Sequence, residues 1–162
     1  MSWPAALRQR SLAIALAIAF ATATIGGALT EIGPWYRGLE KPWFQPPDWA
    51  FGPAWTLIYL LTATAAHLSW QHVTRTRRAW VLILFLGNAA LNAGWSLTFF
   101  WLQRPDLAVW ESCALWASIL ALMIVFGKAH RAVIPLLMPY LLWVSFATYL
   151  NQAIVELNAP FV

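Results

Sequence analysis

Long apolar runs alternate with short polar connections along this chain. Four of the runs hold no charged residue, and the fourth in chain order holds only Glu111. Each run is about 20 residues long, which is the length that crosses a bilayer as a helix. The pattern predicts spans at residues 11–30, 53–72, 79–102, 107–127 and 132–155. These spans use most of the chain, so we expect one all-α membrane domain over residues 1–162, a five-helix bundle.

Composition and charge support a membrane protein. The 162 residues are 61% hydrophobic and only 10% charged, which is too apolar for a soluble domain of this size. Basic residues favour one set of connections: Arg8, Arg10, Arg75, Arg77, Arg78, Lys128 and Arg131, against Arg37, Lys41 and Arg104 on the other side. The bias predicts a cytoplasmic N-terminus, an external C-terminus and, for a bacterial cell, the inner membrane. Because these basic residues are spread over short loops, they do not indicate a nucleic-acid-binding surface.

The first run follows basic residues and so has some features of a signal peptide. Its apolar core of about 18 residues exceeds the 7–15 of a signal sequence, so we interpret it as a span. Ala15, Ala19, Ala23 and Gly27 recur every fourth residue. This smooth ridge favours close packing within the bundle.

An aromatic segment, residues 35–55, separates the first two spans. It contains Trp35, Trp43, Trp49 and Trp55 together with four prolines. Prolines fix φ and remove backbone donors, so one continuous helix is not expected here. Aromatic rings add contact area at low rotamer cost. We interpret this segment as a stiff lid over a cavity at the outer face.

Polar side chains mark one face of the third span. Asn88, Asn92 and Ser96 recur at four-residue intervals, and Trp95 and Phe99 flank them. Amides within hydrocarbon need partners, so this face points into the bundle. Both interpretations stay open: hydrogen bonding between helices, or a polar anchor for a ligand.

Two further four-residue patterns border the same region. Trp55 and Tyr59 share a face of the second span beneath the lid, and Trp143, Ala147 and Asn151 share a face of the fifth. The small Ala147 leaves room for a ligand or for a neighbouring helix. A cavity rich in indole rings favours a large, flat, mostly apolar ligand.

Conventional catalytic and metal motifs are not recognisable. The sequence shows no glycine-rich phosphate loop, no Cys/His cluster and no nucleophile–base motif. His67 and Glu111 are each more simply explained as polar groups near a helix end than as a ligand or proton relay. No metal and no required cofactor are expected.

Three motifs resemble those of the TspO/MBR family of tryptophan-rich sensory and translocator proteins. The first is W-Y-x-x-L-x-K-P-x-x-x-P-P-x-W-x-F-x-P-x-W-T-x-x-Y, from Trp35 to Tyr59. The others are N-x-x-W-S-x-x-F-F at Asn92–Phe100 and P-Y-x-x-W-x-x-F-A-x-x-L-N at Pro139–Asn151. Together with the predicted spans, the resemblance covers the whole chain.

The resemblance implies a homodimeric five-helix membrane protein whose first loop closes a ligand cavity. It also implies porphyrins, such as protoporphyrin IX or haem, as ligands. The candidate ligand-binding residues are Tyr36, Trp43, Pro46, Trp49, Trp55, Tyr59, Asn92, Trp95, Phe99, Trp143, Ala147 and Leu150.

Three functions agree with this resemblance. The first is a receptor or carrier for porphyrins, linked to tetrapyrrole metabolism and stress regulation. The second is light-dependent porphyrin degradation, with Trp55 and Trp143 as candidate catalytic residues. The third is a sterol- or lipid-binding transporter, which is less favoured because no basic residue closely follows Tyr149 in the fifth span.

Overall fold

A computed structural model describes residues 5–161 of the chain, and residues 1–4 and 162 of the predicted domain lie outside this description. The described residues are almost entirely helical and contain no strand, so the all-α prediction is confirmed. The elements are α1 (Ala5–Leu29), α2 (Pro34–Gly38), α3 (Asp48–His72), the 3₁₀-helix η1 (Arg75–Arg77), α4 (Arg78–Ser96), the π-helical η2 (Leu97–Trp101), α5 (Pro105–Gly127) and α6 (Val133–Asn158).

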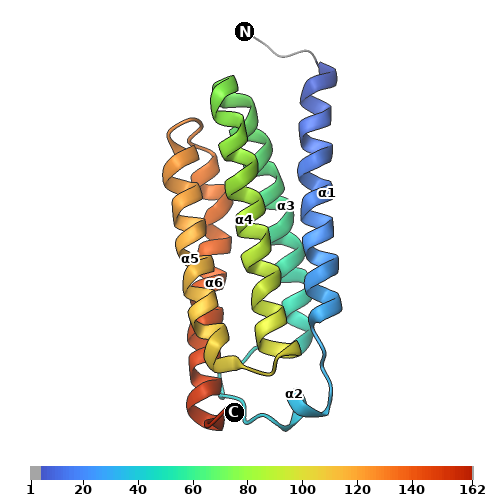
Figure 1. The fold of residues 1–162 in the computed structure, drawn as a ribbon, viewed down its shortest axis with the longest axis vertical. Helices are drawn as coiled ribbons and strands as arrows, with labels where there is room; N and C mark the ends of the chain where they lie inside the picture. The colour runs from blue at the N-terminus through green and yellow to red at the C-terminus, as the bar shows by residue number, and fades with distance from the viewer. Residues whose placement is uncertain (1–4, 162) are drawn as a thin grey trace.

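The long helices run side by side along one axis (Figure 1). α1 forms one edge next to α3 and α4, while α5 and α6 pair at the opposite edge. The first loop, residues 30–47, contains the short α2 and crosses one end of the bundle toward the C-terminus. This loop therefore covers the end of the bundle to which α6 leads.

Within the described residues, four helical segments are long and apolar enough to cross a membrane: Gln9–Leu29, Arg75–Trp101, Pro105–Gly127 and Val133–Asn158. α3 is as long as α1, at 25 residues, but is not among these four. Its tryptophan, tyrosine, threonine and histidine residues keep its mean hydropathy below that of the four segments. The count of five spans therefore stays a prediction.

The predicted start of the second span is wrong by five residues. We expected Pro53 in the first turn, but α3 begins at Asp48 and carries Pro53 inside the helix. The backbone N–H of Ala50 donates to the carbonyl of Pro47 at 2.9 Å, which closes the first turn. Pro53 is the sixth residue of α3 and so lies past the first four N–H groups, which lack helical partners in any case. It therefore removes one helical hydrogen bond, the one to the carbonyl of Trp49.

The end of the predicted third span also differs. Residues 79–102 were expected as one helix, but α4 changes to the π-helical η2 after Ser96. The N–H of Leu102 donates to the carbonyl of Leu97 at 2.9 Å, five residues back. This wider turn rotates the following side chains relative to a regular α-helix.

Two apolar clusters hold the bundle together. The larger one packs Ile119, Leu122, Phe126, Val133 and Leu137 at the end away from the first loop. A smaller cluster under the first loop contains Tyr36, Phe99, Ala108, Leu150 and Ile154. The larger cluster fills the interior of the bundle at the end away from the first loop. The smaller cluster secures the loop to the helices.

Candidate functional site

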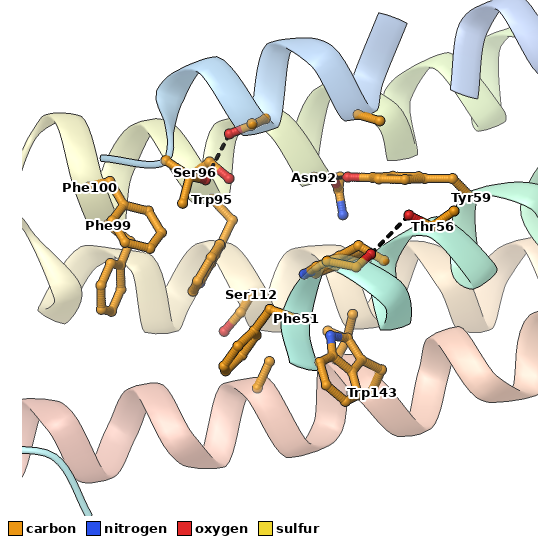
Figure 2. A pocket seen from close by; sticks show the side chains of 18 of the residues that line it. Phe51, Thr56, Tyr59, Asn92, Trp95, Ser96, Phe99, Phe100, Ser112 and Trp143 are labelled. Carbon is orange, nitrogen blue, oxygen red and sulfur yellow. Dashed lines mark hydrogen bonds between the residues drawn. The ribbon is translucent and has the colours of Figure 1, made fainter. Parts of the chain in front are cut away.

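A cavity of about 830 Å³ lies inside the bundle beneath the first loop. Its walls come from all five long helices, from η2 and from the first loop. Ligand pockets usually measure about 300–1,000 Å³, so the cavity is large enough for a drug-sized or larger ligand. Figure 2 shows Tyr59 and Asn92 at one end of it, with Trp95, Phe99 and Phe100 toward the other.

Tyr59, Asn92 and Tyr140 form a hydrogen-bonded group at the deep end of the cavity. The Tyr59 hydroxyl donates to Asn92 Oδ1 at 2.6 Å, and Asn92 Nδ2 donates to the Tyr140 hydroxyl at 3.1 Å. The Trp55 ring stacks on Tyr59 with centroids 5.5 Å apart. This group joins α3, α4 and α6, so the Asn92 amide serves helix packing and lines the cavity at once.

Asn88 shows the purely structural use of a buried amide. Its Nδ2 donates to Ser118 Oγ at 2.8 Å and so joins α4 to α5. Asn88 does not line the large cavity. The two asparagines that share a face in the sequence therefore have different surroundings.

Aromatic rings from α4 and η2 form one side wall. Trp95 stacks on Phe99 with centroids 5.1 Å apart, and Phe100 meets Trp95 edge-on at 5.9 Å. The π-helical turn brings two successive phenylalanines into contact with the same indole. No pattern in the sequence indicates such a turn, so this arrangement was not predicted.

Residues of α6 form the opposite wall. Trp143, Ala147 and Leu150 lie at helical spacing and all line the cavity. The Trp143 ring contacts Phe51 of α3 at a centroid distance of 5.7 Å (Figure 2). Ala147 leaves open space between larger neighbours, as one of its two predicted interpretations required.

Tyr36 is the residue of α2 that faces the cavity. Its hydroxyl donates to Asp48 Oδ1 at 3.0 Å and accepts a hydrogen bond from Gln45 Nε2 at 3.2 Å. Lys41 Nζ lies 4.0 Å from the centre of the ring. Burial, followed by the hydrogen bond to Asp48, raises the pKa of Tyr36 to about 12. The phenol therefore stays neutral at physiological pH and keeps its hydrogen bonds.

The first loop is also fastened to the end of α6. The Glu40 N–H donates to Asn158 Oδ1 at 2.8 Å, and Asn158 Nδ2 donates to the Glu40 carbonyl at 2.9 Å. Phe44 stacks on Tyr149 with centroids 5.1 Å apart. These contacts join residues far apart in sequence and hold the loop across the cavity.

Most of the predicted site residues share this cavity. The lining includes Tyr36, Trp55, Tyr59, Asn92, Trp95, Phe99, Trp143, Ala147 and Leu150. Trp43, Pro46 and Trp49 do not line it: Trp43 is 95% exposed, Trp49 is 76% exposed and Pro46 is half-buried. The expected place of these three on the cavity wall is therefore corrected. These residues were chosen for their aromatic or proline side chains, and residue type does not show which way a side chain points. That direction depends on the backbone of the loop and on the start of α3 at Asp48.

The contribution of α1 was missed. Ala19, Ala23 and Gly27 line the cavity, although they were interpreted as part of a packing ridge, and the neighbouring Gly26 lines it as well. Small residues serve both purposes, so the sequence alone does not separate packing from lining. Phe51, Ser112 and Asn151 also line the cavity and were not among the candidates.

The wall between α1 and α3 differs from the others in exposure. Phe20 of α1 is 74% exposed and Leu60 of α3 is 52% exposed, yet both line the cavity. On the opposite side, Asn92 is 5% exposed. The cavity is therefore open to the outer surface of the bundle between α1 and α3.

Few charges border the cavity. Among the described lining residues, Asp48 is the only Asp, Glu, Lys, Arg or His. The residues that the structure describes contain no group of three His, Cys, Asp or Glu side chains that could hold a metal ion. Aromatic faces and neutral hydrogen-bonding groups are thus what the cavity offers to a ligand.

The fold and the cavity define a helical membrane protein with a large, mostly apolar internal cavity. A model of the TspO/MBR family matches residues 13–157. The tryptophan-rich protein TspO of Archaeoglobus fulgidus is 40% identical over 148 residues, which cover 91% of this chain and 92% of the relative.

Two other relatives extend the comparison across bacteria and animals. The tryptophan-rich sensory protein of Cereibacter sphaeroides is 34% identical, covering 82% of each chain. The human translocator protein is 32% identical, covering 74% of this chain and 72% of the relative. The chain therefore belongs to the TspO/MBR family, which confirms the resemblance.

Proposed function

We propose that the protein binds a flat, apolar, porphyrin-type ligand in the cavity and acts as a membrane receptor or carrier for it. The observation that carries this proposal is the 830 Å³ cavity walled by Trp55, Trp95 and Trp143 beneath a fastened loop. Indole faces suit a large conjugated ring. The tetrapyrrole identity rests on the family resemblance, because aromatic walls alone suit several flat molecules.

Titration of the purified protein with protoporphyrin IX tests the proposal through quenching of tryptophan fluorescence. We expect saturable binding near one ligand per chain. Ala147→Trp places a large ring in the cavity and should weaken binding strongly, whereas Ala114→Trp, at an exposed position of α5 outside the lining, should not. Equal binding by both variants would place the ligand elsewhere.

We propose further that α3 also crosses the membrane, which gives five spans with the N-terminus in the cytoplasm. Its length of 25 residues and its place beside α1 support this topology. Single cysteines at Gly38 and Thr76, with Cys113 replaced by serine, test it. An impermeant maleimide should label the first in intact spheroplasts and the second only after lysis. Labelling in the reverse order would overturn the orientation.

A homodimer is the assembly that we propose. Ile83, Gly87 and Ala90 form an exposed face of α4, where small residues permit close approach of a second helix. Gly94, by contrast, faces Glu111 inside the bundle. Gly87→Ile should convert a dimer to a monomer in sedimentation experiments. A wild-type chain that sediments as a monomer at all concentrations would contradict the dimer.

One observation favours light-dependent degradation as a second candidate. Trp55 contacts both Tyr59 and Tyr140, with centroids 5.5 and 6.0 Å apart, so three oxidisable rings adjoin at the cavity. Illumination of the complex in air, followed by absorption spectroscopy, separates the two functions. Loss of many porphyrin molecules per chain, reduced in Trp55→Phe, would support degradation. Stable porphyrin at full occupancy would leave a binding protein.

A further inference from the structure

Four residues of the described cavity wall carry a buried polar atom without a hydrogen-bond partner, and three of them, all except Gln45, lie on the long helices. Asn151 of α6 is 1% exposed, and neither Nδ2 nor Oδ1 of its amide is paired. The indole Nε1 atoms of Trp95 and Trp143 are also buried without a partner. An unpaired buried polar group typically costs about 1–3 kcal/mol, so such groups in a native protein call for an explanation.

The other asparagine of the cavity makes the contrast clear. Asn92 has both ends of its amide occupied, by the hydroxyls of Tyr59 and Tyr140. Asn151 also lines the cavity, but its amide has no protein partner. The amide of Asn151 therefore has hydrogen-bonding capacity left for a ligand that displaces its neighbours, whereas that of Asn92 is already paired at both ends.

We propose that Asn151, with the indole N–H groups of Trp95 and Trp143, is a hydrogen-bonding site for uncharged oxygen acceptors, such as carbonyl or ester oxygens, on the flat ligand. This inference rests on the proposed function and narrows its ligand class. The three side chains supply donors from Nδ2 and two Nε1 atoms but only one acceptor, Oδ1. A ligand edge that carries oxygen acceptors matches this set.

The charges around the cavity indicate that the acceptor is uncharged. Lys, Arg and His are missing from the described lining residues, and the acid Asp48 lies there already. A buried carboxylate without a cation costs much more than a neutral carbonyl that accepts the same hydrogen bonds. Ionised groups of a ligand are therefore expected outside this part of the cavity.

The Asn151 amide is covered by neighbouring side chains, so a ligand reaches it by displacing them. Replacement by leucine has a specific expected effect for this reason. Asn151→Leu removes an unpaired buried amide at similar volume, so the ligand-free protein should keep or gain thermal stability. Its affinity for a carbonyl-bearing ligand should fall at the same time. A purely structural asparagine would show the opposite change in stability.

Two uncharged porphyrins provide the test. Protoporphyrin IX dimethyl ester carries carbonyl oxygens, whereas etioporphyrin carries only alkyl groups on the same ring. We expect the wild type to bind the ester about 5- to 20-fold more tightly, the range of one or two good hydrogen bonds. Asn151→Leu should remove this difference by weakening ester binding alone. Gln152→Leu, at an exposed neighbouring position, should preserve it.

Each alternative result has a distinct meaning. Unchanged ester binding in Asn151→Leu would overturn the inference while leaving the proposed function intact. Equal weakening of both porphyrins with lower thermal stability would make Asn151 structural and also overturn it. If the free acid bound more tightly than the ester and lost more affinity in the variant, the site would be one for carboxylates. A wild type that binds no porphyrin at all would remove the proposed function itself.

Discussion

Aromatic side chains decide how much binding energy the cavity can provide. Trp55, Trp95 and Trp143 come from three different helices and enclose the same space. Each indole contacts at least one other ring, which limits its rotamers before a ligand arrives. Prearranged rings lose little conformational entropy on binding, so little of the free energy gained from their contacts with a ligand is offset.

We predict that Trp143→Ala weakens porphyrin binding by about 1–3 kcal/mol, as for other buried aromatic anchors. Fluorescence or absorption titration measures the change. Trp80→Ala is the matched control, because Trp80 is exposed and does not line the cavity. Equal affinities of the two variants would exclude Trp143 from the site.

Tyr36 gives a prediction of pH dependence. Because its pKa is raised from 10 to about 12, the neutral phenol is favoured in the folded protein. Its contribution to stability is complete below pH 10 and is lost as the pH rises toward 12. Porphyrin retention by the wild type should decline over this interval.

Tyr36→Phe is the control for this pH dependence, since phenylalanine keeps the ring but does not ionise. Retention by the variant should be lower at neutral pH, because the hydrogen bond to Asp48 is missing. It should also lack the part of the decline that depends on the phenol. A decline of the same size in both proteins would assign the effect to another group.

At the scale of elements, the attachment of the first loop controls how long a ligand stays. Asn158 makes two hydrogen bonds to the Glu40 backbone and thereby joins the loop to the last turn of α6. The Phe44–Tyr149 contact lies in the same region. These contacts add to the apolar cluster around Tyr36, which packs the loop against the helices.

Replacing Asn158 with alanine should increase the rate of porphyrin release by about 3- to 10-fold, since partly exposed hydrogen bonds contribute about 0.5–1.5 kcal/mol each. Stopped-flow dilution measures this rate, and circular dichroism should show unchanged helix content. Gln152→Ala is the control, because Gln152 pairs with Glu156 away from the loop. An unaltered release rate would locate the barrier between helices.

Sequence patterns predicted the elements better than their ends. Long runs without charge located the helices, because a bilayer demands both length and apolarity. The pattern did not show that α3 begins before Pro53, since proline is favoured at the start of a helix and disfavoured inside one. It also gave no sign of the π-helical turn at Leu97–Trp101, which depends on packing.

The same limit applies to the site. Helical spacing identified the inward faces around Trp55, Asn92 and Trp143, where the regular repeat fixes direction. Residue type alone did not fix direction for Trp43, which lies in the irregular first loop, or for Trp49, which lies in the first turn of α3 and points outward. Asn151 was noted for its spacing alone. Its missing partners become visible only when all neighbouring helices are in place.

At the scale of the whole molecule, the walls of the cavity are unequal. The side formed by α4, α5 and α6 is buried, whereas the side between α1 and α3 reaches the outer surface of the bundle. Phe20, Leu60 and the neighbouring small residues on this side are uncharged. In a membrane this surface faces hydrocarbon.

The opening between α1 and α3 makes the bilayer the solvent from which the site is filled. The rate at which the site fills then depends on the mole fraction of ligand dissolved in lipid and not on its aqueous concentration. Protoporphyrin diesters with methyl and with longer alkyl chains differ in aqueous concentration when their mole fractions in the bilayer are equal. Fluorescence quenching in proteoliposomes should therefore proceed at similar rates for these diesters. A rate that falls with the aqueous concentration would mean that the ligand arrives from water, past the first loop.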